Sequence, residues 1–381
     1  MNEAPVPVRW YWLLIVPTIV GSLTGMVVGA LVLLVERLLL DRLVLGLPGL
    51  WFAVPAVGVF LLTRLAMVRV AGTTKPGTAD LYPYYYHHDE VHYPLRQSPG
   101  RILSGITTVG LGGSQGLESQ SVLVGDSVGM LLRRFTRGRF AFLASVEGRK
   151  LLLVCGAAAG ISTVFSSPLL GAAYGIEMPF RNRLDGRRIV PALLAAGFSY
   201  LTASLFHASS TLMTYVPHDI GPVEMLGVAI VAVLCGLGAR AFTWCMHRSK
   251  SWKDGARPWW RATAAGLGLC VLTAAAFLAT GAKVVAGPGY LASEWAIPAT
   301  GPSPVAWLVI VALACRILSV LLCVAAGGGG GVFTSLATNG LLIGVGVAVL
   351  LGLDNVTLLA LVGAGAFLGA GYRIPLAGAG L

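Results

Sequence analysis

The sequence predicts an all-α, polytopic membrane protein whose 381 residues form two helical halves with broken, tilted helices. The first observation is composition: 56% of the residues are hydrophobic and only 11% are charged, against about 25% charged residues in a soluble domain. Too few charges remain to cover a surface that faces water. The second observation is an internal repeat rich in glycine. Small residues let membrane helices approach closely, and they also mark broken helices.

Charge and cysteine patterns exclude several other classes. The net charge is +11, but the basic residues form short clusters at the ends of apolar runs, as in cytoplasmic loops of membrane proteins. No basic patch is interleaved with aromatic residues, so no nucleic-acid partner is expected. The six cysteines lie in or beside apolar runs without CxxC spacing, which indicates core residues. The segment of residues 1–9 is short and polar, so no cleavable signal peptide is expected.

The apolar runs predict how the chain crosses the membrane. Residues 10–40 form a first span with Gly21, Gly25 and Gly29 spaced by four, and residues 43–70 form a second. Residues 102–111, 116–132, 151–164 and 168–176 are mostly too short for a straight crossing and predict discontinuous helices. Further apolar runs are 189–206, 223–242, 262–280, 305–326, 332–353 and 357–371. Leu381 lies within an apolar segment, so the second half is expected to be incomplete and truncated.

Residues 71–97 are polar, aromatic and rich in proline, which favours a loop or a short broken helix at the membrane edge. His88 and His92 stand four residues apart with Glu90 between them, a spacing that could hold a metal on a regular helix. The flanking prolines oppose such a helix, and no third ligand is well spaced. We therefore expect no metal and no cofactor. Because no nucleophile is paired with a base here, we also expect no enzyme.

The repeat is visible at two nearly equal offsets. A shift of 215 residues places Gly112, Gly116 and Gly125 on Gly327, Gly331 and Gly340. A shift of 207 residues places Pro168 and Gly171 on Pro375 and Gly378. Chance matching among 50 glycines is the alternative, but two blocks in the same order favour a duplication. We expect halves at 10–210 and 222–381, with paired helix starts pointing their positive ends at one anion.

Glu118 directly follows the glycine-rich stretch of residues 112–116. Glycines before a helix let backbone N–H groups converge on an anion. A carboxylate at that place is itself an anion and competes with any other. This conflict suggests that Glu118 gates an anion pathway. The alternative is an ordinary carboxylate that stabilises the dipole at a helix start.

Four motifs are more specific than composition. They are the Gly-Ala-Ala-Ala-Gly run of residues 156–160 with Phe165, Pro168 and Gly171 after it; Gly116-Leu117-Glu118; Gly330-Gly331-Val332-Phe333; and residues 371–376. Gly287-Pro288-Gly289-Tyr290 adds a fifth. Together they resemble the CLC family of chloride channels and chloride/proton antiporters over nearly the whole chain.

The resemblance implies one transmembrane domain over residues 1–381, without a CBS domain, in the lipid bilayer of the cell membrane. It also implies a homodimer with one pore in each subunit, chloride or a similar small inorganic anion as the transported ion, and no cofactor. Glu118 matches the family's gating glutamate. The residues that would hold the anion are Thr73, Gly116, Leu117, Ser119, Val332, Phe333 and Thr334.

Several positions depart from the family pattern. Leu117 stands in place of Arg or Lys, and Ser119-Gln120 in place of Gly-Pro. Antiporters carry a second acid directly after the position of Glu177, where this chain has Met178. Channel-like or weakly proton-coupled conduction is therefore favoured. The alternatives are an antiporter that uses Glu177 or Glu147 and a relative that transports nothing. For Glu177 the competing interpretation is a structural ion pair with Arg181. Fluoride and nitrate stay open as substrates.

Overall fold

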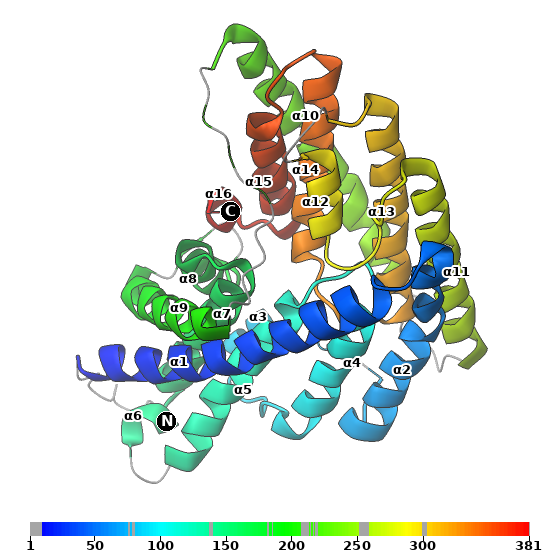
Figure 1. Cartoon of the computed structure of the whole chain (residues 1–381). Helices are drawn as coiled ribbons and strands as arrows, with labels where there is room; N and C mark the ends of the chain where they lie inside the picture. Colours follow the sequence, from blue (N-terminus) through cyan, green and yellow to red (C-terminus); the bar gives the residue numbers. More distant parts are fainter. Residues whose placement is uncertain are drawn as a thin grey trace.

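The computed structural model describes residues 10–74, 77, 81–136, 140–180, 183–184, 186–206, 213, 215, 217, 220–250, 259–298 and 303–380. Over these residues the chain is helical, and its one β-type pairing is an isolated antiparallel bridge between Gly116 and Gly331. In Figure 1, α10, α14 and α15 stand together above α1 and α5. The end of the described chain lies near α8.

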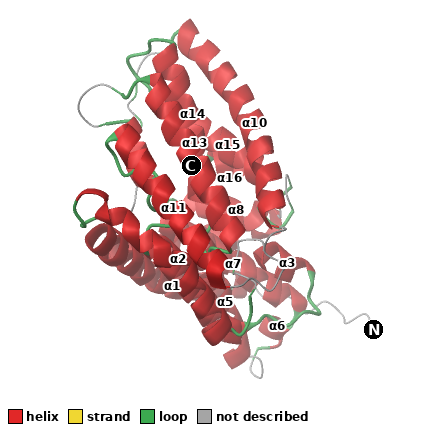
Figure 2. Cartoon of the chain, turned by 90° about the vertical axis from the view of Figure 1, so that its right-hand side faces the viewer, coloured by secondary structure: helices red, strands yellow, loops and turns green. Residues whose placement is uncertain are grey.

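The first half contains α1 (Trp12–Val32), η1 (Leu33–Val44), η2 (Gly49–Gly58), α2 (Val59–Ala66), η3 (Met67–Ala71), α3 (Leu81–His87), η4 (Leu95–Gln97), α4 (Ser98–Gly110), α5 (Glu118–Thr136), α6 (Ala141–Ala144), α7 (Val146–Phe165), α8 (Pro168–Glu177), η5 (Gly186–Arg188), α9 (Ile189–Ala203) and η6 (Ser204–Phe206). The second half contains α10 (Pro222–Lys250), α11 (Trp259–Thr280), α12 (Tyr290–Ala296), α13 (Ala306–Ala326), α14 (Phe333–Leu350), α15 (Thr357–Tyr372) and α16 (Pro375–Ala379). Figure 2 shows that the helices lie at many different inclinations.

Eight helices within the described ranges are long and apolar enough to cross a membrane. One of them corrects an expectation from the sequence. The apolar run 151–164 looked too short to span, but α7 begins earlier, at Val146, and has 20 residues. The side chain of Ser145 caps this helix by accepting from Gly148 N–H at 3.1 Å, so polar residues before the apolar run extend it.

The first span is longer than the apolar pattern indicated. After α1 the chain continues as the π-helical η1 to Val44, beyond the expected end at residue 40. The glycine face predicted on α1 is confirmed: a Cβ at Gly21 would lie within 3.0 Å of Ala195 O, and one at Gly25 equally close to Ser199 O. Both partners belong to α9. The glycine spacing therefore sets the closest approach between α1 and α9.

The two halves repeat one helix crossing. Gly125 of α5 packs so closely on Gly156 of α7 that a Cβ there would lie within 3.0 Å of a carbonyl oxygen. Gly340 of α14 packs in the same way on Gly363 of α15. These pairs correspond under the 215- and 207-residue offsets, so α5–α7 and α14–α15 are equivalent units.

The polar segment 71–97 forms α3 and the short η4, as the expectation of a loop or broken helix allowed. Arg149 of α7 stabilises the conformation of this segment by donating to the carbonyls of Tyr85 and Val91 at 3.0 and 2.9 Å. No group of three His, Cys, Asp or Glu side chains within the described ranges could hold a metal. His88 instead packs its ring on Tyr84, with 4.4 Å between centroids.

Candidate anion site at the paired glycine loops

The two glycine loops meet and bond to each other. Gly116 N–H donates to Gly331 O at 2.9 Å, and Gly331 N–H donates to Gly116 O at 2.7 Å. Helix α5 begins two residues after Gly116, and α14 begins two residues after Gly331. The bridge thus brings two helix N-termini together. Their exposed N–H groups and dipoles favour negative charge at this place.

The Glu118 carboxylate fills this place. Its side chain is 1% exposed, and its Oε1 accepts a hydrogen bond from Thr334 N–H at 2.7 Å and another from the Thr334 hydroxyl. Oε2 has no hydrogen-bond partner. A Cβ at Gly116 or Gly331 would lie within 3.0 Å of the carboxylate oxygens, so only glycine leaves room for them. Glu118 therefore bonds across the repeat to the start of α14.

Other expected site residues surround Glu118 in different ways. Gly331 also lies close to Ser119. A Cβ added at Gly331 would lie 3.0 Å from the Ser119 N and 3.1 Å from the Ser119 Oγ. Val332 and Phe333 are buried, and the Phe333 ring packs on Phe165 with 4.9 Å between centroids. The backbone of these residues is where an anion could bind; their side chains form the apolar wall.

Leu117 and Thr73 are placed differently. The Leu117 side chain is buried in an apolar cluster with Val28, Val124 and Val164, so its place in the site is through its backbone. Thr73 follows η3, where its backbone N–H donates to Met67 O at 3.2 Å. A contact of its hydroxyl with the anion stays a prediction.

Polar residues that the sequence reading did not assign tie the loops together. Gln120, at a position where the family has proline, donates through Nε2 to Gly329 O of the opposite loop. Ser114 Oγ donates to Val285 O at 2.6 Å, and Ser335 Oγ donates to Ser114 O at 3.1 Å. Gln120, Ser114 and Ser335 therefore cross-link the two halves. Polar side chains within an apolar run were the only signal in the sequence.

Arg316 of α13 supports the same region. It is fully buried and donates through Nη1 to Val284 O at 2.9 Å and through Nη2 to Pro288 O at 2.7 Å. No carboxylate of the described residues forms an ion pair with it. The guanidinium holds the loop that packs on Ser114, and it places a positive charge beside that loop.

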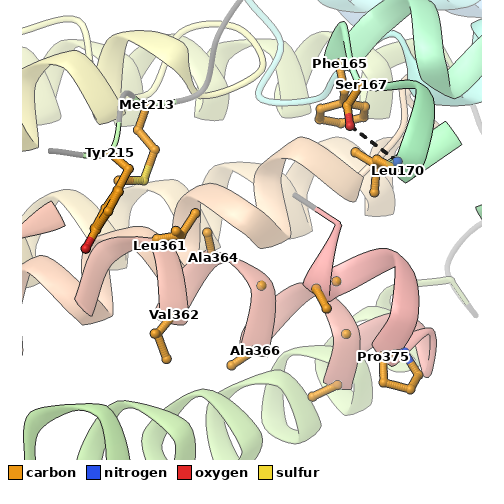
Figure 3. A pocket seen from close by; sticks show the side chains of 15 residues that line it. Phe165, Ser167, Leu170, Met213, Tyr215, Leu361, Val362, Ala364, Ala366 and Pro375 are labelled. Carbon is orange, nitrogen blue, oxygen red and sulfur yellow. Dashed lines mark hydrogen bonds between the residues drawn. The ribbon is translucent and has the colours of Figure 1, made fainter. Parts of the chain in front are cut away.

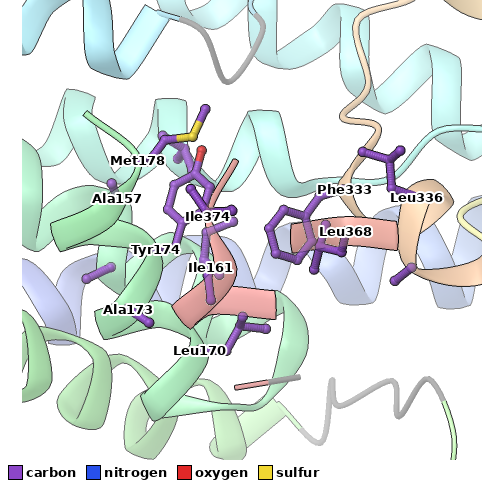
Figure 4. Close-up of a cluster of buried hydrophobic side chains, with 14 of the residues drawn as sticks. Ala157, Ile161, Leu170, Ala173, Tyr174, Met178, Phe333, Leu336, Leu368 and Ile374 are labelled. Atoms are coloured by element: carbon purple, nitrogen blue, oxygen red, sulfur yellow. The ribbon is translucent and has the colours of Figure 1, made fainter. Parts of the chain in front are cut away.

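Glu177 has a structural contact. Its Oε1 accepts from Leu376 N–H at 3.2 Å and its Oε2 from Ala377 N–H at 3.0 Å, so it binds the first turn of α16. The Arg181 that we expected to pair with it lies outside the described residues. Met178, the next residue, is buried in the apolar cluster beside Tyr174 and Ile374 (Figure 4).

A cavity of about 670 Å³ opens between α8, α15 and α16. Met213, Tyr215 and Leu361 line one part, and Ser167, Leu170 and Pro375 another (Figure 3). Its lining is mainly apolar and holds no charged side chain. It reaches Phe165, whose ring contacts Phe333 at the start of α14. The cavity therefore borders the anion site without containing its polar groups.

Comparison with known proteins agrees with this geometry. Residues 59–381 match the family model described as voltage gated chloride channel. The chain belongs to the CLC family. Among its CLC relatives are the H(+)/Cl(−) exchange transporters ClcA of Citrobacter koseri, 28% identical over 296 residues, and of Salmonella agona, 27% identical over the same length. Both alignments cover 74% of this chain and 60% of the relative, so the chain spans about three fifths of their length.

Solved CLC structures share the fold. A CLC-type fluoride/proton antiporter matches with a TM-score of 0.77 at 21% identity, covering 96% of this chain and 89% of that one. A slow cyanobacterial Cl⁻/H⁺ antiporter matches with a TM-score of 0.77 at 21% identity, covering 99% and 90%. The predicted fold class, a helical CLC-like membrane protein with an inverted repeat, is confirmed. The roles of the individual site residues stay predictions.

Replacing Thr334 by valine should weaken the hold on Glu118, because the variant loses the hydroxyl donor and keeps the backbone N–H. A hydrogen bond to a charged group contributes about 1.5–3 kcal/mol. If Glu118 gates an anion path, the anion flux of reconstituted Thr334→Val at neutral pH should rise roughly tenfold or more. Thr338→Val is the matched control, since this hydroxyl donates to Thr334 O on the same helix at 2.9 Å. Equal flux in both variants would contradict the prediction.

Proposed function

We propose that this CLC protein moves chloride or a similar small anion across a lipid bilayer through a path gated by Glu118. The observation that carries the proposal is the bond from Thr334 N–H at the start of α14 to the Glu118 carboxylate. A helix N-terminus that holds a buried carboxylate can hold a small anion in its place. Protonation would remove the charge that keeps Glu118 there, and the anion would then enter.

We further propose that transport is channel-like or weakly proton-coupled, with fewer protons moved for each anion than in tight exchange. Met178 stands where antiporters of the family carry an acid, and Glu177 is already engaged with α16. Relatives and solved structures that resemble this chain are named exchangers and antiporters, so tight exchange is the second candidate. Homodimer formation and a place in the cell membrane belong to the same proposal, because they are typical of the family. Chloride is the first anion to test, with fluoride and nitrate beside it.

The test is flux into liposomes that contain the purified protein, with chloride, fluoride or nitrate supplied and external pH recorded. Anion uptake with little proton movement supports channel-like or weakly coupled transport. Stoichiometric counter-movement of protons supports the antiporter. If none of the three anions moves or binds, the chain is a relative that does not transport them.

Replacing Glu177 by glutamine should change stability and leave proton movement unchanged. The variant loses the charge that faces two N–H groups of α16, an interaction that contributes about 1 kcal/mol. We expect a slightly lower melting temperature in detergent and an unaltered ratio of protons to anions in the flux assay. A strongly reduced ratio of protons to anions would contradict this prediction and would indicate that Glu177 takes part in proton transfer.

A further inference from the structure

We infer that Asp126 binds a proton inside the membrane and carries the protons that accompany anion movement. This inference rests on the proposed function and names a residue that the family pattern does not supply. Asp126 lies on α5, eight residues after Glu118. It was not among the residues that the sequence singled out.

The Asp126 carboxyl is buried without a counter-ion. The residue is 1% exposed, and its Oδ1 has no hydrogen-bond partner. No cation of the described residues forms an ion pair with it. An acid within a membrane domain is costly, and one that is neither paired nor bonded is a functional candidate by default. The neutral, protonated form fits these surroundings best, since a charge there would be left uncompensated.

Two tyrosines of neighbouring segments interact electrostatically with this carboxyl. Tyr82 of α3 and Tyr93, which precedes η4, both lie close enough to Asp126 for electrostatic interaction. No charged side chain acts strongly on Asp126 itself. The ionisable surroundings are therefore two neutral hydroxyl groups, which can pass a proton without binding it permanently.

Hydroxyl groups at the next position of α5 form a chain toward a half-buried tyrosine. Tyr93 is half-buried, and its OH lies 3.4 Å from Ser127 Oγ, on the residue next to Asp126. Ser127 Oγ in turn donates to Ser98 Oγ at 3.0 Å. This chain of hydroxyls offers a proton an approach from the membrane edge. A proton from water would add to a carboxylate oxygen of Asp126, and the same O–H bond would break when the proton leaves.

Ring packing connects Tyr82 to the start of α14, although the rings themselves carry no proton. Tyr82 packs on Tyr174 with 6.3 Å between centroids, and Tyr174 packs on Phe333 with 5.9 Å. Phe333 directly precedes Thr334, which holds Glu118. Figure 4 shows Tyr174 and Phe333 side by side in this cluster. Eight helical residues span about 12 Å, so the last transfer to Glu118 needs bridging water or side-chain motion.

The repeat shows that packing alone does not require an acid here. The offset of 215 residues pairs Asp126 with Leu341, which is fully buried on α14. It likewise pairs Glu118 with Phe333. Both acids of α5, Glu118 and Asp126, thus correspond to apolar residues of the equivalent helix α14. The first half carries two carboxyl groups that the shared architecture can do without.

The test compares Asp126→Asn and Asp126→Leu with the unaltered protein, and uses Asp354→Asn, which removes an exposed acid, as control. Proton and anion fluxes are recorded together in liposomes. In parallel, infrared difference spectra on a pH jump follow the C=O stretch of a protonated carboxylic acid. We expect both Asp126 variants to keep anion flux within about threefold and to lose at least tenfold in protons moved per anion. They should also lose one carboxylic-acid band, while melting temperatures stay close to that of the control.

Three results would overturn the inference. They are an unchanged carboxylic-acid band, an unchanged ratio of protons to anions in both variants, or anion flux without any proton movement in the unaltered protein. If the unaltered protein moves no anion, the proposed function fails, and the infrared band alone decides whether Asp126 binds a proton. If Asp126→Asn folds poorly, Asp126→Leu still provides the test, because leucine occupies the equivalent position on α14.

Discussion

Replacing Glu118 by alanine should leave an anion path that no longer responds to pH. In the unaltered protein the carboxylate accepts two hydrogen bonds from Thr334 and occupies the start of α14. Each such bond to a charged group contributes about 1.5–3 kcal/mol. Alanine removes the competing charge, so chloride alone would meet the N-termini of α5 and α14. Flux at neutral pH should increase, and proton movement should vanish.

The pH profile is the decisive measurement for Glu118. The protonated fraction of a single titrating carboxyl can change by up to about tenfold per pH unit. Flux of the unaltered protein should therefore rise steeply as pH falls, because protonation releases the gate. Glu118→Ala should vary by less than about twofold over the same interval. A profile that stays as steep as before would show that another group gates the path.

Glu147→Gln provides the matched control for this experiment. Glu147 is the other acid that the sequence offered, and its carboxylate pairs with Arg188 at 2.6 Å while remaining 64% exposed. An exposed ion pair contributes little to stability. The pH profile of this variant should follow that of the unaltered protein. Loss of the pH response in both variants would indicate a general effect of reduced negative charge.

The sequence was sufficient to predict the meeting of the two halves at Glu118. The glycine offset put Gly116 opposite Gly331, and these residues form the bridge between the loops. The glycines predict this contact because only glycine leaves room for the Glu118 carboxylate at both positions. The helix start at Glu118 follows from the same pattern.

Contacts between distant segments could not be read in the same way. Nothing near Glu177 in the sequence indicates that it binds N–H groups of residues 376 and 377, whereas the adjacent Arg181 suggested an ion pair. The link from Gln120 to Gly329 O has the same origin, because the pairing exists only once the loops are packed. Asp126 did have a signal that was missed. It is an acid in an apolar run whose helical neighbours at four residues, Val122 and Met130, carry no charge.

Adding a methyl group at Gly125 or Gly340 should destabilise the fold by amounts that are similar to each other. At both positions the new Cβ would lie within 3.0 Å of a carbonyl oxygen, of Gly156 on α7 and of Gly363 on α15 respectively. The helices would have to separate, and overpacking of this kind costs about 1–3 kcal/mol. The gain of about 1 kcal/mol from replacing glycine by alanine in a helix offsets at most the lower end of this cost.

The matched control for both variants is Gly236→Ala on α10, where a Cβ meets nothing within 4 Å and stability should hold or rise. Melting temperatures in detergent, followed by the loss of the folded protein's elution peak, give the comparison. Similar decreases in melting temperature for the Gly125 and Gly340 variants would mean that the two helix crossings contribute equally to stability. A loss at Gly340 alone would mean that the first half tolerates separation of α5 from α7. Because Glu118 stands on the first turn of α5, anion flux in Gly125→Ala would then show whether the gate depends on that crossing.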